Sequence, residues 1–334
     1  MPRSFIAGIG MYAPQNIVTN NDLKKYMDTS DEWIQERTGI TERRYAHRTE
    51  ETTTTMGVEA SKIAIERAGI TPQDIDFIVF ATITPDYYFP GCGVLLQREL
   101  GIPEIGALDI RNQCSGFIYA ISIADQFIKS GMYKTVLVVG AEIQSSIMDI
   151  SDKGRSMAVI FGDGAGAIVM QATQHPERHI LSTHLHADGR YAEELIVKDP
   201  GGSRAGRWIS KEMIENGSTD PYMNGNTVFK HAVVRFPEVI MEALQANGCS
   251  VQDIDMLIPH QANLRITNYV REKLKLSEDK VFSNIQKYGN TTAASIPIAL
   301  SEAWEAGKIQ PGHLVCLAAF GSGFTWGSAL IRWQ

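Results

Sequence analysis

The chain contains two related segments that lie about half its length apart. Gln73-Asp74-Ile75-Asp76 and Gln252-Asp253-Ile254-Asp255 each precede an apolar stretch, and the offset between them is 179 residues. Gly131 and Gly307 precede two more apolar stretches at an offset of 176 residues. A repeat of this length indicates a duplicated fold unit rather than a solenoid of short repeats. We therefore expect two similar halves, residues 1–172 and 173–334, related by an approximate twofold axis.

The composition fits one large intracellular protein. The chain has 334 residues, of which 44% are hydrophobic, and no low-complexity linker divides it. Its formal net charge of −7 argues against nucleic acid as a partner. The four cysteines form no Cys-x-x-Cys pair, which favours a reducing, cytoplasmic location. We expect neither a signal peptide nor a membrane span, because residues 1–10 resemble a strand and no apolar run is long enough to span a membrane.

Cys114 stands at a junction between a strand and a helix. The stretch Ile105–Ile110 predicts a buried strand, and residues 115–129 predict an apolar helix. A thiol at the start of a helix faces unpaired backbone N–H groups and the positive end of the helix dipole, and both favour the thiolate. Cys114 is therefore a candidate nucleophile. The alternative is a plain core residue, which is common for a cysteine in an apolar segment.

Two polar residues in the last third of the chain are candidate partners of this thiol. His260 follows the apolar run Met256–Ile258, so it lies at the C-terminal end of a predicted strand. Asn290 follows Gly289, which marks a tight turn, and opens the next predicted helix. Active sites of α/β proteins form at such strand ends and helix starts. A core histidine and a simple helix cap are the alternative interpretations.

The repeat connects these residues to one place in the fold. At an offset of 176, Asn290 corresponds to Cys114, and at an offset of 179, His260 corresponds to Ala81. If both halves fold alike, the two helix starts point at one central site.

Two further patterns could indicate a nucleotide or a metal. Gly162–Ala167 precedes the strand Ile168–Met170 rather than a helix, so we interpret it as a tight turn between strands and not as a dinucleotide loop. His184 and His186 lie on one face of a predicted strand, but no nearby cysteine or carboxylate pattern completes a metal site. We therefore expect no metal.

Five ordered motifs together resemble those of the ketoacyl-acyl-carrier-protein synthase III family. They are Cys114-Ser115-Gly116-Phe117, Gly162–Ala167, Pro259–Arg265, Gly289-Asn290-Thr291 and Gly321–Gly327. The resemblance implies a thiolase-like fold, in which two βαβαβαββ halves form a five-layered αβαβα sandwich, and a homodimer. It implies no cofactor beyond the acyl-CoA and malonyl-acyl carrier protein substrates.

The resemblance also implies a decarboxylating Claisen condensation that initiates fatty acid synthesis. An acyl group moves from acyl-CoA to Cys114, and malonyl-acyl carrier protein then loses carbon dioxide and attacks the thioester. His260 and Asn290 would donate hydrogen bonds to the enolate, a task that fits a neutral imidazole and a carboxamide. The backbone N–H groups of Cys114 and Ser322 would form the oxyanion hole.

The same resemblance implies residues that bind the substrates. Trp33, Arg37 and Thr38 match the site for the CoA adenine and phosphate, and Gly225-Asn226 matches a pair along the pantetheine arm. Asn263 and Arg265 would contact CoA or the carrier protein, and Phe89 would enter the acyl pocket of the dimer mate. A basic rim would attract the acidic carrier protein. Its candidate members are Arg37, Arg43, Arg44, Lys230, Arg265, Arg271 and Lys273.

Three departures from the family's usual pattern leave the acyl substrate open. Arg111-Asn112-Gln113 is bulkier than usual before the nucleophile, the segment 152–161 is longer, and Ser322 replaces a glycine. The leading interpretation is an initiation enzyme for acetyl-CoA or another short acyl-CoA. The alternative is a secondary-metabolism ketosynthase for a longer or different acyl thioester, and a scaffold subunit without activity is a third.

Overall fold

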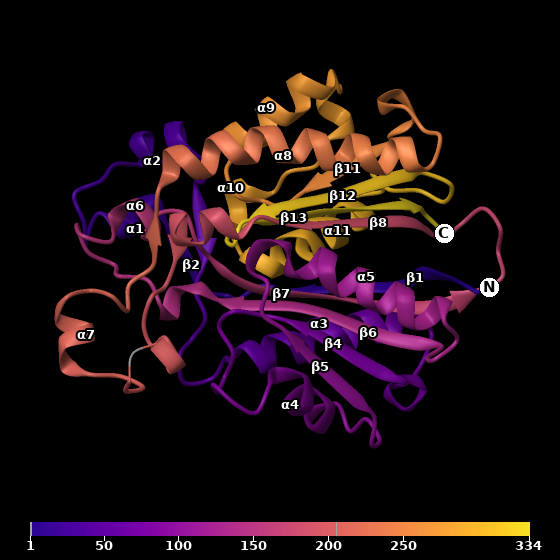
Figure 1. The fold of residues 1–334 in the computed structure, drawn as a ribbon, viewed down its shortest axis with the longest axis horizontal. Helices are drawn as coiled ribbons and strands as arrows, with labels where there is room; N and C mark the ends of the chain where they lie inside the picture. Colours follow the sequence, from indigo (N-terminus) through magenta and orange to yellow (C-terminus); the bar gives the residue numbers. More distant parts are fainter. Residues whose placement is uncertain (1, 205) are drawn as a thin grey trace.

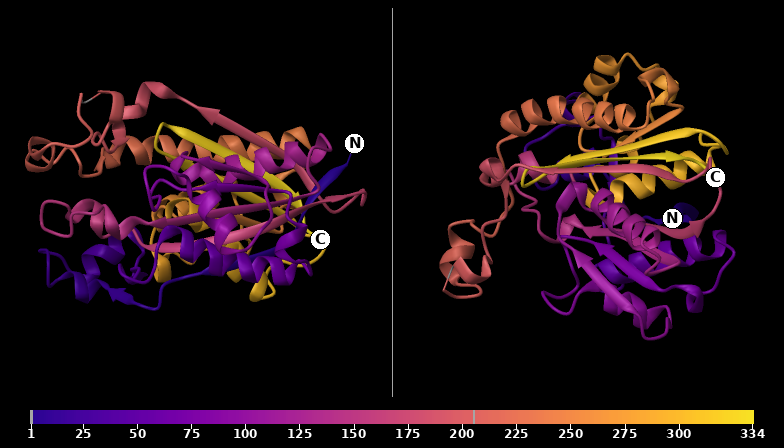
Figure 2. Two further views of the ribbon diagram at one scale, coloured as in Figure 1. Left: turned by 90° about the horizontal axis from the view of Figure 1, so that it is seen from below. Right: turned by 45° about the vertical axis from the view of Figure 1, so that its right-hand side comes forward.

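Two β-sheets lie face to face, with two helices between them and further helices on each outer side (Figure 1). The structure is a computed structural model that describes residues 2–204 and 206–334. Both chain ends lie at the same end of the sheets (Figure 2).

The first sheet has five strands in the order β1-β7-β6-β4-β5. The central strand β4 is parallel to β5 and β6, whereas β7 runs antiparallel to both β6 and β1. All five residues of β4 are buried, as expected for a parallel strand that is covered on both faces. The strands are β1 (Arg3–Tyr12), β4 (Phe77–Ala81), β5 (Gly106–Ile110), β6 (Thr135–Ile143) and β7 (Asp163–Thr173).

The second sheet repeats this arrangement in the order β8-β13-β12-β11. A single parallel bridge between Leu257 and Val281 occupies the place of the fifth strand. The strands are β8 (Ile180–Ala187), β11 (Met256–Pro259), β12 (Leu314–Gly321) and β13 (Thr325–Arg332). The first sheet thus ends at Thr173 and the second begins at Ile180, on either side of the predicted boundary between residues 172 and 173.

The helices form three layers around the two sheets. The central pair is α5 (Gly116–Lys129) and α11 (Ser295–Glu305), the first sheet is covered by α3 (Thr53–Arg67) and α4 (Cys92–Glu99), and the second by α8 (Gly225–Ala246) and α9 (Leu264–Leu274). Phe117 and Ile121 of α5 are fully buried in the same apolar cluster as Val138 of one sheet and Leu317 of the other. The predicted five-layered αβαβα fold is confirmed.

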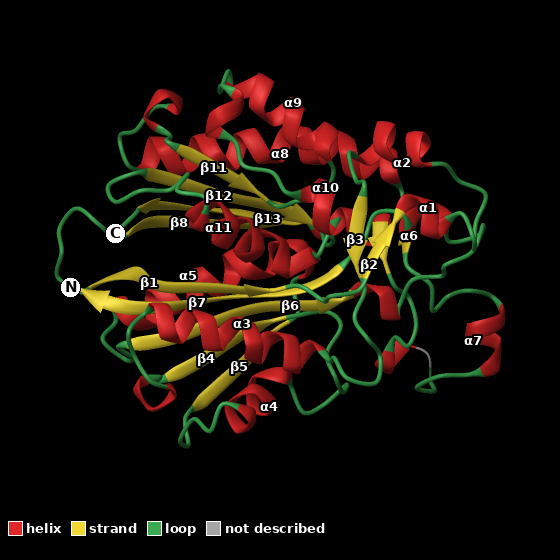
Figure 3. Cartoon of the chain, turned by 180° about the vertical axis from the view of Figure 1, so that it is seen from behind, coloured by secondary structure: helices red, strands yellow, loops and turns green. Residues whose placement is uncertain are grey.

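The remaining elements lie mostly around the ends of the sheets (Figure 3). The short helices and strands are β2 (Ile17–Thr19), α1 (Asn20–Leu23), α2 (Asp31–Thr38), β3 (Glu42–Arg44), α6 (Arg155–Ala158), β9 (Leu195–Ile196), α7 (Lys211–Glu215), β10 (Tyr222–Met223) and α10 (Ile285–Tyr288). The 3-10 helices are η1 (Pro72–Asp74), η2 (Gln113–Ser115), η3 (Gln144–Ser146), η4 (Gly189–Glu194), η5 (Gly202–Arg204), η6 (Val251–Asp253), η7 (Glu278–Lys280) and η8 (Thr292–Ala294). The segment that carries α7 extends away from the sheets (Figures 1 and 2).

The two halves correspond at an offset of 179 residues. β4 and β11 begin at 77 and 256, β6 and β12 at 135 and 314, and α5 and α11 at 116 and 295. The offset of 176 applies only to the helix ends at 129 and 305, because α11 is shorter than α5. Cys114 therefore corresponds to Ala293, and the prediction that it corresponds to Asn290 is wrong. The offset of 179 does match His260 with Ala81.

Two local predictions are also wrong. β5 is an edge strand with Leu108 37% exposed, rather than the buried strand predicted before Cys114. The glycine-rich segment forms no turn, because β7 already begins at Asp163. A Cβ at Gly166 would lie 2.5 Å from Cβ of Pro297, so the glycine allows α11 to approach the strand closely.

Among residues 2–204 and 206–334, no helix combines the length and apolar character needed to cross a membrane.

Candidate active site

Cys114 lies in η2, between β5 and the start of α5. Its residue is 8% exposed, and the backbone N–H groups of Cys114 and Ser322 face its sulfur. Gln113, directly before it, has a φ of 45°, an uncommon backbone conformation for a residue other than glycine. The turn that follows β12 therefore places the N–H of Ser322 beside the thiol.

The charge state of this thiol differs from the prediction. Burial, and next the negative charge of Glu142, raise the pKa of Cys114 to about 12, although the two N–H groups act in the opposite direction. The prediction of a favoured thiolate considered only the helix start and not the loss of water around the sulfur. In this structure the thiol form is favoured.

His260 is held as a neutral imidazole. It follows β11 directly, is 2% exposed, and its backbone N–H donates to Ala318 of β12 at 2.8 Å. Burial lowers the pKa of His260 to about 3. The hydroxyl of Ser295 lies 2.6 Å from Nδ1 and also accepts from the N–H of Gln261, so its own proton points to Nδ1. The ring proton is then on Nε2, as the prediction requires.

Asn290 presents the N–H₂ end of its side chain as a donor. It does not open a helix; its backbone forms a parallel bridge with Phe161 through bonds to Ile160 and Gly162. Its Oδ1 accepts from the N–H of Thr292 at 2.9 Å. The carboxamide oxygen is therefore occupied, and among the described residues Nδ2 has no hydrogen-bond partner and is not sealed from solvent.

The elements that carry these three side chains converge at the paired starts of α5 and α11. A Cβ at Gly116 of α5 would lie 3.6 Å from Cβ of Ala293 in η8. His260 reaches the first residue of α11 through Ser295, and Cys114 contacts Gly321 at the end of β12. Cys114, His260 and Asn290 thus line the same end of the central layer.

A hydroxyl network that the sequence analysis did not identify holds the turn after β12. Ser115 and Thr325 join their hydroxyls at 2.7 Å, and the Thr325 hydroxyl donates to the carbonyl of Ser322 at 3.0 Å. The hydroxyl of Ser322 donates to the carbonyl of Leu195 in β9. The serine that replaces glycine in the family pattern therefore anchors this turn, and its N–H stays free for the thiol.

The residues predicted to bind the CoA adenine lie on α2. The guanidinium of Arg37 lies 4.6 Å from the centre of the Trp33 ring, and that of Arg155 lies 5.1 Å from it. Arg155 was not predicted, and it comes from the longer segment 152–161. Thr38 differs from the prediction, because its buried hydroxyl donates to the carbonyl of Ile34 within the helix.

Asn263 connects this helix to α9. Its Nδ2 donates to the carbonyl of Arg37 at 2.9 Å, while its Oδ1 accepts from the N–H of Arg265 as the cap of α9. Arg265 is exposed and lies 5.7 Å over the ring of Phe229. Gly225 and Asn226 open α8, where a Cβ at Gly225 would meet open space.

The predicted basic rim loses one member. Arg43 is fully buried and donates to Asn20 and to the carbonyl of Val159, so it cannot meet a partner. The exposed members are Arg37, Lys230, Arg265 and Lys273, whereas Arg44 and Arg271 are half-buried.

Phe89 is 80% exposed in the segment between β4 and α4. Tyr88 beside it is 62% exposed and lies 4.1 Å from Trp208, ring centre to ring centre. These aromatic side chains form an apolar patch on the same side of the molecule as the edge strand β5.

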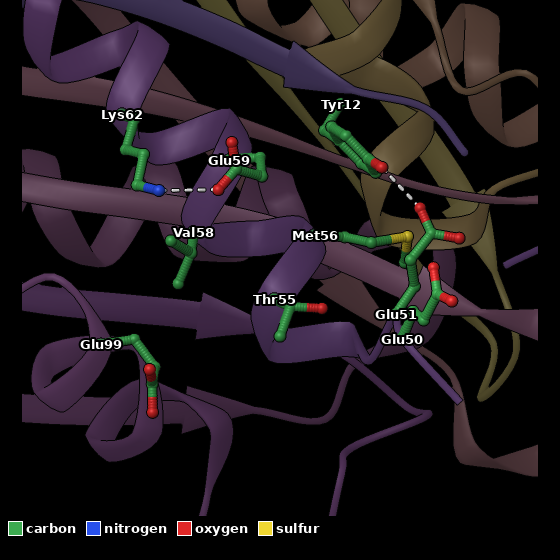
Figure 4. Close-up of a pocket in the computed structure, with 9 residues that line it drawn as sticks. All are labelled: Tyr12, Glu50, Glu51, Thr55, Met56, Val58, Glu59, Lys62 and Glu99. Atoms are coloured by element: carbon green, nitrogen blue, oxygen red, sulfur yellow. Dashed lines mark hydrogen bonds and ion pairs between the residues drawn. The ribbon is translucent and has the colours of Figure 1, made fainter. Parts of the chain in front are cut away.

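A cleft of about 350 Å³ lies away from these residues, between Tyr12 and α3 (Figure 4). It is lined by carboxylates, among which Glu51 accepts from the Tyr12 hydroxyl and Glu59 pairs with Lys62. An acidic, open cleft does not fit an acyl chain.

His184 and His186 share one carboxylate. Glu242 lies 3.3 Å from Nδ1 of His184 and 2.6 Å from Nε2 of His186. Across residues 2–204 and 206–334, no group of three or more His, Cys, Asp or Glu side chains is arranged to hold a metal ion.

A duplicated α/β fold with a buried cysteine, a neutral histidine and an asparagine amide at its centre defines a thiolase-like enzyme of the acyltransferase type. Comparison with known proteins agrees with this class. The profile described as 3-oxoacyl-[acyl-carrier-protein (ACP)] synthase III matches residues 108–189, and the profile of its C-terminal part matches residues 244–333.

Individual proteins match over nearly the whole chain. The beta-ketoacyl-[acyl-carrier-protein] synthase III of Xanthomonas euvesicatoria pv. vesicatoria is 48% identical over 99% of this chain and 98% of its own length. The 3-oxoacyl-[acyl-carrier-protein] synthase III of Aquifex aeolicus VF5 has a TM-score of 0.90 at 46% identity, over 99% of this chain and 100% of that one. The priming beta-ketosynthase of the R1128 polyketide pathway has a TM-score of 0.90 at 34% identity, over 99% and 96%. The chain belongs to the 3-oxoacyl-[acyl-carrier-protein] synthase III family.

Proposed function

We propose that this enzyme condenses an acyl-CoA primer with malonyl-acyl carrier protein and thereby initiates fatty acid synthesis. The observation that carries this proposal is the convergence of Cys114, His260 and Asn290 at the paired starts of α5 and α11. The relatives at 46–48% identity, which are named as beta-ketoacyl-[acyl-carrier-protein] synthases III, support it.

In the first half-reaction the sulfur of Cys114 attacks the carbonyl carbon of the acyl-CoA thioester. The new S–C bond forms as the bond to the CoA sulfur breaks, and CoA takes up the proton that the thiol gives up. Because the thiol form is favoured in the closed site, substrate binding or a transient base must assist this step. The N–H groups of Cys114 and Ser322 face the sulfur and would hold the developing oxyanion.

In the second half-reaction the malonyl carboxylate leaves as carbon dioxide. Its C–C electron pair moves toward the thioester carbonyl, so that negative charge builds on the thioester oxygen. Nε2–H of His260 and Nδ2 of Asn290 are neutral donors suited to this enolate. The enolate carbon then attacks the acyl-Cys114 thioester, and the sulfur leaves as 3-oxoacyl-acyl carrier protein forms.

The CoA adenine would stack on Trp33 between two guanidinium groups. Arg37 and Arg155 already lie over that ring, and both can also pair with phosphate. We assign Thr38 a structural role within α2, since its hydroxyl is bonded to the helix backbone. Gly225, Asn226, Asn263 and Arg265 remain candidates for the pantetheine arm and the carrier protein.

The enzyme would act as a homodimer in the cytoplasm. β5 presents an unpaired edge, and the exposed Phe89 lies in the loop that follows its neighbour β4. A second copy that pairs along this edge would cover both features, and Phe89 would then enter the partner's acyl pocket. All four cysteines are free thiols, which agrees with a reducing compartment.

A secondary-metabolism ketosynthase remains the second candidate. The priming ketosynthase of a polyketide pathway shares 34% identity and the same fold, so the fold alone does not separate the two. Incubation with acyl-CoAs of graded length, followed by the mass of the Cys114 adduct, distinguishes them. We expect adducts with short acyl groups, and loading of long chains alone would support the second candidate.

An inactive scaffold subunit is tested separately. We expect the purified protein to release carbon dioxide from malonyl-acyl carrier protein, whereas a scaffold subunit would release none.

A further inference from the structure

A buried carboxylate lies beside Cys114 and has no part in the steps proposed above. Glu142 is the residue before the end of β6, and it is fully buried. Among the residues that the structure describes, no lysine, arginine or histidine forms an ion pair with it. A buried carboxylate without a cation needs another explanation.

Glu142 holds two segments that border the site. The hydroxyl of Thr84 donates to Oε2 at 2.6 Å, the N–H of Ile83 lies 3.2 Å from each oxygen, and the hydroxyl of Thr82 lies 3.3 Å away. The backbone N–H of Ala293 in η8 also donates to this carboxylate. It therefore joins the segment that leads toward Phe89 to the turn that follows Asn290.

The duplicated fold gives this position a meaning. At the offset of 179, Glu142 corresponds to Gly321 and Ala293 corresponds to Cys114. In one half, glycine at 321 leaves room for the thiol beside the N–H of Cys114. In the other half, the Glu142 side chain reaches the N–H of Ala293. Each helix start thus holds one potential anion, and the two anions influence each other.

We propose that Glu142 is a positioning residue that ties the start of α11 to the Thr82–Thr84 segment and places a titratable negative charge beside Cys114, so that the reactivity of the thiol depends on the charge of Glu142. This inference rests on the proposed role of Cys114 as nucleophile. It concerns the thiol itself, however, and can be tested without turnover.

The electrostatics give the proposal its sign. Burial raises the pKa of Glu142 to about 7, although the bonds from Thr84 and Ile83 lower it. Once Glu142 is charged, it raises the pKa of Cys114, so the thiolate becomes harder to form. Below pH 7 the carboxyl is neutral and this restraint is absent.

The other groups around Glu142 do not titrate in this range. Thr82, Thr84, Gln144 and the backbone of Ala293 are neutral, and the pKa of His260 is about 3. The nearby carboxylate of Asp163 bonds Ser145 and the N–H of Ala46, and that of Asp86 bonds Thr52 and the N–H of Thr54. A change near pH 7 in the reactivity of Cys114 would therefore report Glu142.

The test is the rate of alkylation of Cys114 by iodoacetamide between pH 5.5 and 9, with the modified peptide identified by mass. We compare the parent with Glu142→Gln, which removes the charge and keeps the shape. Asp163→Asn is the matched control, since Asp163 is also a buried carboxylate without a cation, with its pKa raised by burial to about 6.

We expect equal rates for parent and Glu142→Gln at pH 5.5. At pH 8.5 the variant should react faster by about threefold to tenfold, because each pKa unit changes the thiolate fraction tenfold. The Asp163→Asn profile should have the shape of the parent profile. If the profiles of the parent and Glu142→Gln coincide at every pH, the proposal is wrong, whatever the fate of the condensing activity.

A second variant serves if Glu142→Gln does not fold. Thr84→Ala removes the hydroxyl that lowers the pKa of Glu142, so the inflection of the alkylation profile should move to higher pH. An inflection that stays in place would overturn the proposal.

Discussion

Gly321 lies so close to Cys114 that a Cβ at position 321 would be 2.6 Å from Cβ of Cys114 and 3.1 Å from its sulfur. No real pair of carbon atoms makes such a contact without a shift of the backbone. The end of β12 must therefore be glycine for the next residue to bring its N–H to the thiol. One contact between residues 207 positions apart thus sets the geometry of the proposed oxyanion hole.

Gly321→Ala should lower both stability and acyl transfer. Overpacking of a rigid core costs about 1 to 3 kcal/mol, and the displaced turn would carry the N–H of Ser322 away from the sulfur. Urea unfolding and the rate of self-acylation measure the two effects. Gly189→Ala is the control, because a Cβ there meets nothing within 4 Å. Equal acylation rates for the parent and Gly321→Ala would show that the turn does not shape the site.

His260 and Glu142 should give the folded state opposite dependences on pH. The pKa of His260 is lowered to about 3, so the unfolded chain binds a proton below pH 6.5 that the folded chain does not, and stability is lost as the pH falls. The pKa of Glu142 is raised to about 7, so the folded chain binds the extra proton and stability is gained.

Urea unfolding at pH 7.5 and pH 5 separates these contributions. Relative to the parent, His260→Gln should gain on the order of 1 to 2 kcal/mol on acidification, and Glu142→Gln should lose a similar amount. The same pH dependence in all three proteins would contradict the assigned charge states.

Arg155→Ala should weaken binding of acyl-CoA without changing the chemistry. Arg155 lies over Trp33 on the side chain that would stack on adenine, so its loss removes a contact made equally in ground and transition states. We expect KM for acyl-CoA to rise roughly tenfold while kcat changes little. Arg48→Ala, which leaves Trp33 untouched, is the control. A fall in kcat at constant KM would place Arg155 in a different role.

Arg265→Glu should weaken the use of carrier protein more than self-acylation. Arg265 is exposed at the start of α9 and belongs to the basic rim that remains without Arg43. A reversed charge should slow the condensation with malonyl-acyl carrier protein at least tenfold at low salt, and added salt should reduce the difference. Arg98→Glu on α4 controls for a change in net charge. Equal losses in both half-reactions would argue against a docking role.

Much of the fold could be predicted from the sequence because its determinants are local. The repeated Gln-Asp-Ile-Asp segments and the apolar stretches after them indicated two halves with the same strand order. The position of His260 after a strand needed no more than the apolar run before it. The offset near Asn290 was misjudged, since the shortening of α11 changes the register only where the helix ends.

The electrostatics of the site depend on contacts that no local pattern encodes. Glu142 looks like one residue of an apolar strand until β6 is placed against η8 and η2. Arg43 looks like a surface residue between other charged residues, yet folding buries it completely. The pKa of Cys114 likewise depends on desolvation and on Glu142, neither of which follows from its place at a helix start.

The most direct test of the division of roles follows the acyl group on the protein. The parent, Cys114→Ser, His260→Ala and Asn290→Ala are each incubated with acetyl-CoA and then with malonyl-acyl carrier protein, and the peptides are weighed after each step. We predict that the parent gains and then loses an acetyl group on Cys114. His260→Ala and Asn290→Ala should keep it, with carbon dioxide release slowed about 100-fold or more, and Cys114→Ser should never acquire it but retain some decarboxylation. An acetyl group found on Cys92, Cys249 or Cys316, or released normally by His260→Ala, would contradict the account.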